Sequence, residues 1–280
     1  MSRWVPALTA AWLLTGERRF AQKACDHLRA WFVTPETRMS PSLQFSQGVV
    51  GVSTGRSYGI IDTVHLAEVA RAATLLLPTL SPANADALRL WFHDYLTWMN
   101  TSPMGIQERD TRNNHATCWA LQAAEFSRLT GDDALRRQVA AWFRTSLLGQ
   151  QMALDGSFPL ETARTKPYSY SIFNFDVAAG LAQSLTTPGD DLLRLTLPDG
   201  RGLCKAAAWI FPYLSDKTAW PFPPDVAHFD ALPARSPGLL FSGLACQRPE
   251  YVALWKRENP DPEDREIIRN YPIRQPLLWV

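Results

Sequence analysis

No stretch of the sequence is apolar over the length needed to cross a membrane. Charge of one sign is also lacking: 28 lysines and arginines face 27 acidic residues, for a net charge of +1. A protein that binds nucleic acid in bulk needs a basic field that this balance cannot supply. The composition therefore argues against a membrane or a nucleic acid as partner.

Cysteine is scarce and carries no motif. The four cysteines lie far apart, without a CxxC pair and without the Cys/His spacing of a metal site: Cys25, Cys118, Cys204 and Cys246. Each stands in an apolar context, which is typical of a buried free thiol. We therefore expect four free cysteines and no metal site.

The beginning of the chain has no secretory leader pattern. Met1 to Pro6 is followed by a short apolar run, Ala7 to Leu14, which continues into a further helical segment without a cleavage site. We expect either that the protein stays in the cytoplasm or that this chain lacks the start of a longer precursor.

Hydrophobic residues and tryptophan are plentiful. Hydrophobic residues make up 46% of the chain, which predicts a folded globular protein with a sizeable core. Eleven tryptophans are many for 280 residues. They suit an aromatic helical core, the default expectation, or an aromatic groove for sugar rings.

Helical periodicity dominates, and strand signals are few and short. Two αα-hairpins are predicted around Thr-Gly turns: Ala7–Leu14 with Glu17–Phe32, and Trp119–Leu129 with Asp132–Leu148. Further helices are predicted over Asp62–Leu77, from Ser81-Pro82 to about Met99, Ile172–Leu185 and Leu203–Leu214. Loops are predicted over Thr34–Gly59 and Thr101–Thr111. The fold class is all-α, a toroid or solenoid of antiparallel helical hairpins in one domain, residues 1–280, with a loop-rich tail over 225–280.

Two polar clusters interrupt this apolar pattern. Asn113, Asn114 and His115 stand at the head of the Trp119–Leu129 run, where an asparagine is expected to begin the helix. Arg164 and Tyr170 follow about fifty residues later. Amide, imidazole and guanidinium groups stabilise a developing oxyanion, and a phenol can transfer a proton. Together these groups suit β-elimination from a polyuronate, in which the proton α to the carboxylate is removed.

Structural explanations also exist for the candidate residues. The first cluster could be an asparagine cap followed by a core histidine. Arg164 could pair with Glu161 across a turn, and Tyr168 and Tyr170 could be aromatic packing at a helix start. His65 on an apolar helix face is more often a core histidine. Sequence patterns do not decide between these explanations and a functional role.

Several motifs, taken in order, resemble the alginate lyase domain of polysaccharide lyases. The resemblance covers Trp4 to Pro224 and lies in Gly55-Arg56-Ser57-Tyr58-Gly59-Ile60-Ile61-Asp62-Thr63, Asn113-Asn114-His115, Arg164-Thr165, Tyr170-Ser171-Ile172-Phe173-Asn174, Pro198-Asp199-Gly200-Arg201 and Trp220-Pro221. It implies an (α/α) toroid, no obligatory metal or other cofactor, and eliminative cleavage of alginate or a related acidic polysaccharide. Members are usually exported. The helices that usually precede Trp4 in this family are missing here, so we expect either an incomplete toroid or a chain that is a fragment of a longer one.

The resemblance also implies roles for individual residues. Asn114, His115 and Arg164 would neutralise the uronate carboxylate, Tyr170 would transfer the proton, and His65 is a candidate second acid or base. The expected substrate-binding residues are Gln47, Arg56, Tyr58, Trp119 and Tyr168, of which Trp119 and Tyr58 could instead be core residues.

Two other functions are compatible with a helical toroid. A glycoside hydrolase would use two carboxylates, with candidates among Asp62, Glu108, Asp110 and Glu161. A protein that binds polysaccharide without turning it over is the other alternative. The sequence does not reveal the oligomeric state.

Overall fold

A computed structural model describes all 280 residues of the chain, which divide into two compact units. The first contains Met1–Asp110, Gln122–Arg137 and Arg274–Val280, and the second contains Thr111–Leu121 and Gln138–Ile273. Helices make up the regular structure of both units, and the only β-type pairings are two isolated bridges. The predicted all-α class is therefore confirmed.

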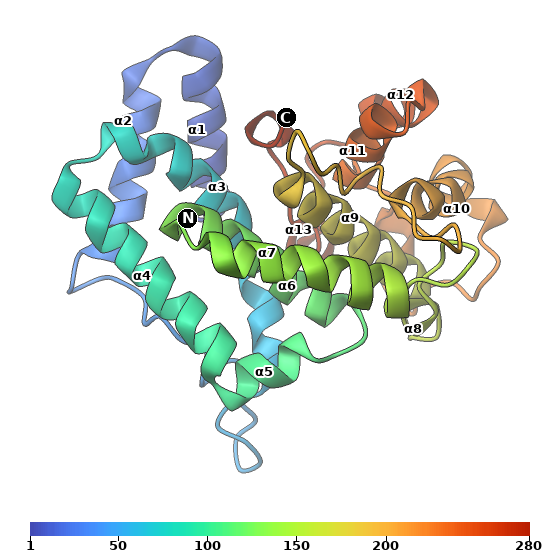
Figure 1. The fold of residues 1–280 in the computed structure, drawn as a ribbon, viewed down its shortest axis with the longest axis horizontal. Coiled ribbons are helices and arrows are strands. Elements are labelled where there is room, and N and C mark those ends of the chain that lie inside the picture. Colours follow the sequence, from blue (N-terminus) through green and yellow to red (C-terminus); the bar gives the residue numbers. More distant parts are fainter. The chain divides into compact units, whose positions relative to one another are not determined.

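The first unit begins with the predicted helical hairpin. Helices α1 (Trp4–Thr15) and α2 (Arg18–Leu28) lie side by side and run in opposite directions (Figure 1). Gly16 joins them with a φ of 73°, and its N–H donates to Trp12 O at 2.8 Å. Only glycine adopts this left-handed conformation without a steric cost, so the Thr-Gly signal located the turn correctly.

The rest of the first unit is helical apart from one long loop. It contains the π-helix η1 (Arg29–Val33), the 3-10 helices η2 (Ser57–Thr63), η3 (Leu77–Thr79) and η7 (Pro276–Leu278), and the helices α3 (Leu66–Leu76), α4 (Pro82–Thr101) and α5 (Pro103–Arg109). Helices α6 (Asn114–Thr130) and α7 (Asp133–Trp142) contribute residues to both units. The predicted long loop lies between η1 and η2. The predicted loop over Thr101–Thr111 is wrong, because most of it forms α5.

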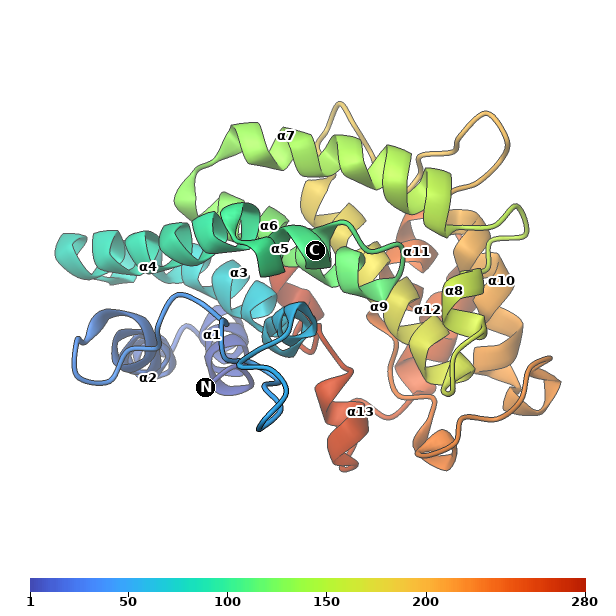
Figure 2. The ribbon, with the colours of Figure 1, turned by 90° about the horizontal axis from the view of Figure 1, so that it is seen from below.

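The second unit is arranged around one buried helix. It contains the π-helix η4 (Phe143–Gln151), the helices α8 (Pro159–Thr162), α9 (Pro167–Leu185), α10 (Leu203–Ser215), α11 (Pro237–Ala245), α12 (Pro249–Arg257) and α13 (Arg265–Arg269), and the 3-10 helices η5 (Lys217–Ala219) and η6 (Phe229–Ala231). Helix α9 is buried along nearly its whole length and contacts α8, α10 and α11 (Figure 2). The expected tail thus holds three helices; Pro237 and Pro249 begin helices rather than interrupt them.

Part of the tryptophan enrichment belongs to core packing: Trp91, Trp119, Trp220 and Trp279 are buried. In the first unit, Phe32 lies 4.6 Å from Trp91 and 5.0 Å from Phe92 between ring centroids, and Trp91 Nε1 donates to Met39 O at 2.7 Å. In the second unit, Trp220 packs edge-on against Trp209. Such contacts supply a large apolar area and satisfy the indole N–H where they can, as expected for an aromatic core.

The cysteine prediction is wrong for two of the four residues. Cys204 in α10 and Cys246, directly after α11, form a disulfide, while Cys25 and Cys118 are buried free thiols. The two bonded cysteines are 42 residues apart in sequence. They meet only because α10 packs against α11. Spacing along the chain carries no sign of that contact.

Two buried carboxylates hold the beginning of α11: Asp176 belongs to α9, and Glu258 directly follows α12. Asp176 accepts a hydrogen bond from Gly238 N at 3.0 Å and another from the Ser236 hydroxyl, and Glu258 accepts from Ser236 N at 3.3 Å. Burial, the largest cause in both cases, raises the pKa of Asp176 to about 7 and that of Glu258 to about 8. Each carboxyl group therefore stays protonated in the folded chain over a pH range in which it is ionised in the unfolded chain.

Asp176→Asn is expected to flatten the dependence of stability on pH. Between about pH 4 and 7 the folded wild type binds protons that the unfolded chain releases, so its free energy of unfolding falls as the pH rises. The fall attributable to this group is on the order of a few kcal/mol. Unfolding by denaturant at pH 5 and pH 8 measures it. The exposed-site variant Asp230→Asn should keep the wild-type slope, and an unchanged slope in Asp176→Asn would contradict the assignment.

Candidate active site

The first polar cluster lies at the start of α6, as its asparagines predicted. Asn113 Oδ1 accepts from His115 N at 3.2 Å, so Asn113 caps the helix that begins at Asn114. The Asn114 N–H donates to Glu161 Oε1 at 2.6 Å. An acidic group at this end of a helix is favourable, because the first N–H groups point outward and carry partial positive charge.

Arg164 connects the two polar clusters. Its Nη1 lies 3.4 Å from Asn114 Oδ1 and 3.2 Å from Glu161 Oε2. The same guanidinium lies over the ring of Tyr170, with its Cζ 3.5 Å from the ring centroid. The pairing with Glu161 and the approach to Asn114 therefore occur together. Arg164 and Tyr170 remain partly accessible to solvent.

Glu161 connects Asn114 and Arg164 through its two carboxylate oxygens. It is 0% exposed, and its two oxygens accept from Asn114 N and Arg164 Nη1 respectively. Burial raises the pKa of Glu161, while the Asn114 N–H and the Arg164 guanidinium act in the opposite direction. The pairing of Glu161 with Arg164 was one of the explanations predicted from the sequence, whereas its bond to Asn114 N at the start of α6 was not predicted.

A further polar atom in the cluster has no partner. Asn114 is 1% exposed, and its side-chain Nδ2 is buried without a hydrogen-bond acceptor. A buried donor left unpaired costs about 1–3 kcal/mol. The cluster therefore offers an amide donor and a guanidinium group from two segments that are fifty residues apart in sequence. This combination suits a carboxylate ligand.

Two expected substrate-binding residues of the second unit are core residues instead. Tyr168 is 0% exposed, its hydroxyl donates to Tyr213 O at 2.8 Å, and its ring packs edge-on against Trp220. Trp119 is 3% exposed. Neither side chain presents a surface on which a sugar ring could stack, so the aromatic-packing alternative describes both.

The remaining predicted residues belong to the first unit, where hydrogen bonds link Gln47, Arg56 and Tyr58. Gln47 Nε2 donates to Asp62 Oδ2 at 2.9 Å, and Arg56 Nε donates to Gln47 O at 2.8 Å. Tyr58 is 44% exposed and accepts through its backbone carbonyl from Gln47 Nε2. His65 is half-buried at the residue before α3. Their roles toward a substrate stay predictions.

No group of three or more His, Cys, Asp or Glu side chains is placed to hold a metal ion. None of the helices has the length and hydropathy that a membrane span requires.

Comparison with known proteins places the chain in a family. Residues 1–220 match the family model described as alginate lyase. The chain belongs to the alginate lyase family. This confirms the resemblance inferred from the motifs and makes the chain a polysaccharide lyase, so the hydrolase alternative is wrong.

Solved structures agree with this assignment. An alginate lyase from Bacteroides ovatus is 27% identical, with a TM-score of 0.83, and the match covers 100% of this chain and 73% of that one. Alginate lyase A1-III from Sphingomonas species A1 is 18% identical, with a TM-score of 0.64 and coverage of 100% and 76%, and shows likeness of fold. The predicted fold class, an all-α toroid or incomplete toroid, is confirmed by these matches. No curated protein sequence matches the chain.

Glu161→Gln is expected to lower kcat by about tenfold or more while leaving the chain folded. Glutamine keeps an acceptor for Asn114 N but loses the charge that holds Arg164, so the guanidinium is less well positioned, and misplacement of this kind is costly to rate. Initial rates of polyuronate cleavage separate kcat from KM. The exposed-residue variant Glu36→Gln should behave as the wild type. A wild-type kcat in Glu161→Gln would contradict this positioning role.

Proposed function

We propose that the chain cleaves alginate or a related mannuronate- or glucuronate-containing polysaccharide by β-elimination. Family membership supports the reaction class. The grouping of Asn114, Arg164 and Tyr170 supports the mechanism, because these residues are the ones to which the family resemblance gives catalytic roles.

The first requirement of the reaction is neutralisation of the uronate carboxylate. Without it, the proton on C5 is too weakly acidic to be removed at a useful rate. Asn114 Nδ2, which has no partner in the protein, and the Arg164 guanidinium would donate to the carboxylate oxygens, and His115 would add a third donor. Donors fixed in place before the reaction stabilise the enolate-like dianion as it forms.

The second requirement is proton transfer on the same side of the sugar ring. Tyr170, as the phenolate, would take the C5 proton, and the C5–H electron pair would enter the enolate. Collapse of the enolate forms the C4–C5 double bond and breaks the C4–O bond. The leaving oxygen then takes the proton back from Tyr170, so the enzyme returns to its starting state without a co-reactant.

The observation that carries this proposal is the position of Arg164, between Asn114 and the Tyr170 ring. A single guanidinium can thereby pair with the substrate carboxylate while lying next to the proton-transfer group. Gln47, Arg56 and Tyr58 are proposed to bind sugar units of the polysaccharide, and His65 is the candidate second acid or base.

A panel of polyuronates tests the proposal. The protein is mixed with alginate, polymannuronate and glucuronan while absorbance in the near ultraviolet is followed, because elimination leaves a double bond conjugated to the carboxylate. We expect absorbance to rise on at least one of the three. A protein that binds these polymers and produces no absorbance on any of them would be a binding protein, and the proposed reaction would be wrong.

A further inference from the structure

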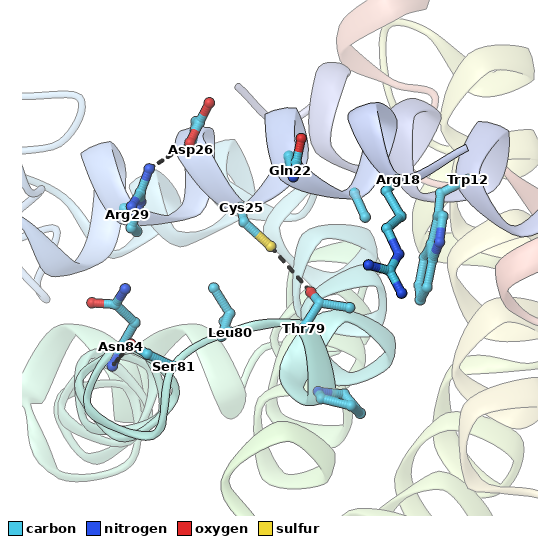
Figure 3. A pocket seen from close by; sticks show the side chains of 12 residues that line it. Trp12, Arg18, Gln22, Cys25, Asp26, Arg29, Thr79, Leu80, Ser81 and Asn84 are labelled. Atoms are coloured by element: carbon cyan, nitrogen blue, oxygen red, sulfur yellow. Dashed lines mark hydrogen bonds and ion pairs between the residues drawn. The ribbon is translucent and has the colours of Figure 1, made fainter. Parts of the chain in front are cut away.

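A large cavity in the first unit contains none of the residues given a catalytic role. It has a volume of about 770 Å³ and is lined by α1, α2 and the segment from Pro78 to Asn84, which includes the start of α4 (Figure 3). Cavities of a few hundred to about 1,000 Å³ are the size in which proteins hold small ligands. One or two sugar units fit such a volume.

One end of the cavity is formed by Trp12 and Arg18. The left-handed turn at Gly16 reverses the chain between them, so that the last turn of α1 faces the first residue of α2. Figure 3 shows the Arg18 side chain alongside the Trp12 indole, both reaching toward the segment around Thr79. Trp12 is half-buried and lines the cavity, which leaves part of its ring available to a ligand.

The charge of the cavity is positive because of Arg18. Arg29 and Asp26, at the other end, pair at 2.5 Å and cancel each other. Arg18 forms no ion pair within the protein, and no other acidic residue lines the cavity. An anionic group that enters would therefore find a single unpaired guanidinium. One guanidinium can bind a carboxylate through two parallel N–H···O bonds.

The other lining groups are neutral and polar. Gln22 and Asn84 provide amides, and Thr79 provides a hydroxyl that contacts Cys25 Sγ at 3.4 Å. Amides and hydroxyls bind sugar hydroxyl groups, and an indole packs on the C–H face of a pyranose ring. The set of one indole, one free guanidinium and several neutral polar groups matches a sugar that carries a carboxylate.

We propose that this cavity is a second binding site for a uronate unit of the polysaccharide, with Arg18 holding its carboxylate and Trp12 its ring. The choice of uronate rests on the proposed function. A second point of attachment raises the effective concentration of a long chain near the enzyme, so it lowers KM for the polymer without changing kcat.

Fluorine NMR of the full chain labelled with 5-fluorotryptophan tests the site directly. The Trp12 signal is assigned by its loss in Trp12→Phe, and the titration is done in the Tyr170→Phe background, in which turnover is expected to be at least about 100-fold slower. We expect oligomannuronate to shift the Trp12 signal, and a neutral oligosaccharide of equal length not to. In Arg18→Gln the shift should require at least tenfold more ligand. No shift with oligomannuronate, or an equal shift with the neutral sugar, would overturn the proposal.

Arg19→Gln is the matched control, because Arg19 is the next residue along α2, pairs with Glu17 at 2.7 Å and does not line the cavity. It should leave the Trp12 titration unchanged. In kinetics, Arg18→Gln should raise KM for the polymer at least threefold with kcat unchanged. Absence of lyase activity on every polyuronate would refute the proposed function, whereas the Trp12 titration decides the second site by itself. An unaltered titration in Arg18→Gln would refute the role of the guanidinium.

Discussion

Tyr170→Phe is expected to reduce kcat on polyuronates by at least about 100-fold, with KM changed little. Proton transfer by a positioned side chain contributes on the order of 10² to 10⁴ in rate, and phenylalanine removes the only group on this side chain that can carry a proton. The ring itself remains, and with it the contact to the Arg164 guanidinium at 3.5 Å from the centroid. The carboxylate donors therefore stay in place while the chemical step is lost.

Tyr213→Phe is the matched control for this variant. Tyr213 is half-buried in α10, its ring packs edge-on against Trp209, and its backbone carbonyl accepts from Tyr168. Loss of its hydroxyl should leave activity as in the wild type. Both variants should melt at the wild-type temperature. Wild-type turnover in Tyr170→Phe would show that another group transfers the proton, with His65 the next candidate to replace.

Local signals in the sequence predicted the helices well where they were strong. The Thr15-Gly16 turn and the Ser81-Pro82 start each depend on one or two residues whose backbone preferences are known. Helix α5 was not predicted from the sequence, because it has only seven residues and no apolar periodicity of its own. Its start was marked by Ser102-Pro103, and a Cβ on Gly105 would lie 2.0 Å from Met99 O, so close packing explains that glycine.

The candidate site needed more than local signals. Asn113 and Asn114 predicted a helix start, which the structure contains, but nothing along the chain indicates that Arg164 lies beside Asn114. The contact between Arg164 and Asn114 was expected only from the family resemblance, which rests on the order of several motifs along the chain. Burial is equally non-local: Tyr168 and Tyr170 are two residues apart on one helix, yet Tyr168 is enclosed and Tyr170 is not. A pattern of residue types cannot distinguish two neighbouring tyrosines in this way.

Loss of the Cys204–Cys246 disulfide is expected to destabilise the second unit by about 4 kcal/mol, the loop-entropy value for a closed loop of 42 residues. A loss of this size lowers the melting temperature by on the order of 10 °C in a unit of this length. Cys204→Ser with Cys246→Ser, and the wild type under reductant, should both show it. Reductant should leave the double variant unchanged, because Cys25 and Cys118 are already free thiols.

A count of thiols in the unfolded chain tests the bond itself. Two thiols should react without reductant and four after reduction; four in both conditions would show that the bond is absent. The position of the bond explains why its loss has a large effect. It joins α10 to the end of α11, and α11 also packs on the buried helix α9 that ends in Leu185 and begins three residues before Tyr170. Loosening α11 removes support from the helix that carries Tyr170, so the reduced protein should lose lyase activity at a lower temperature than the oxidised one.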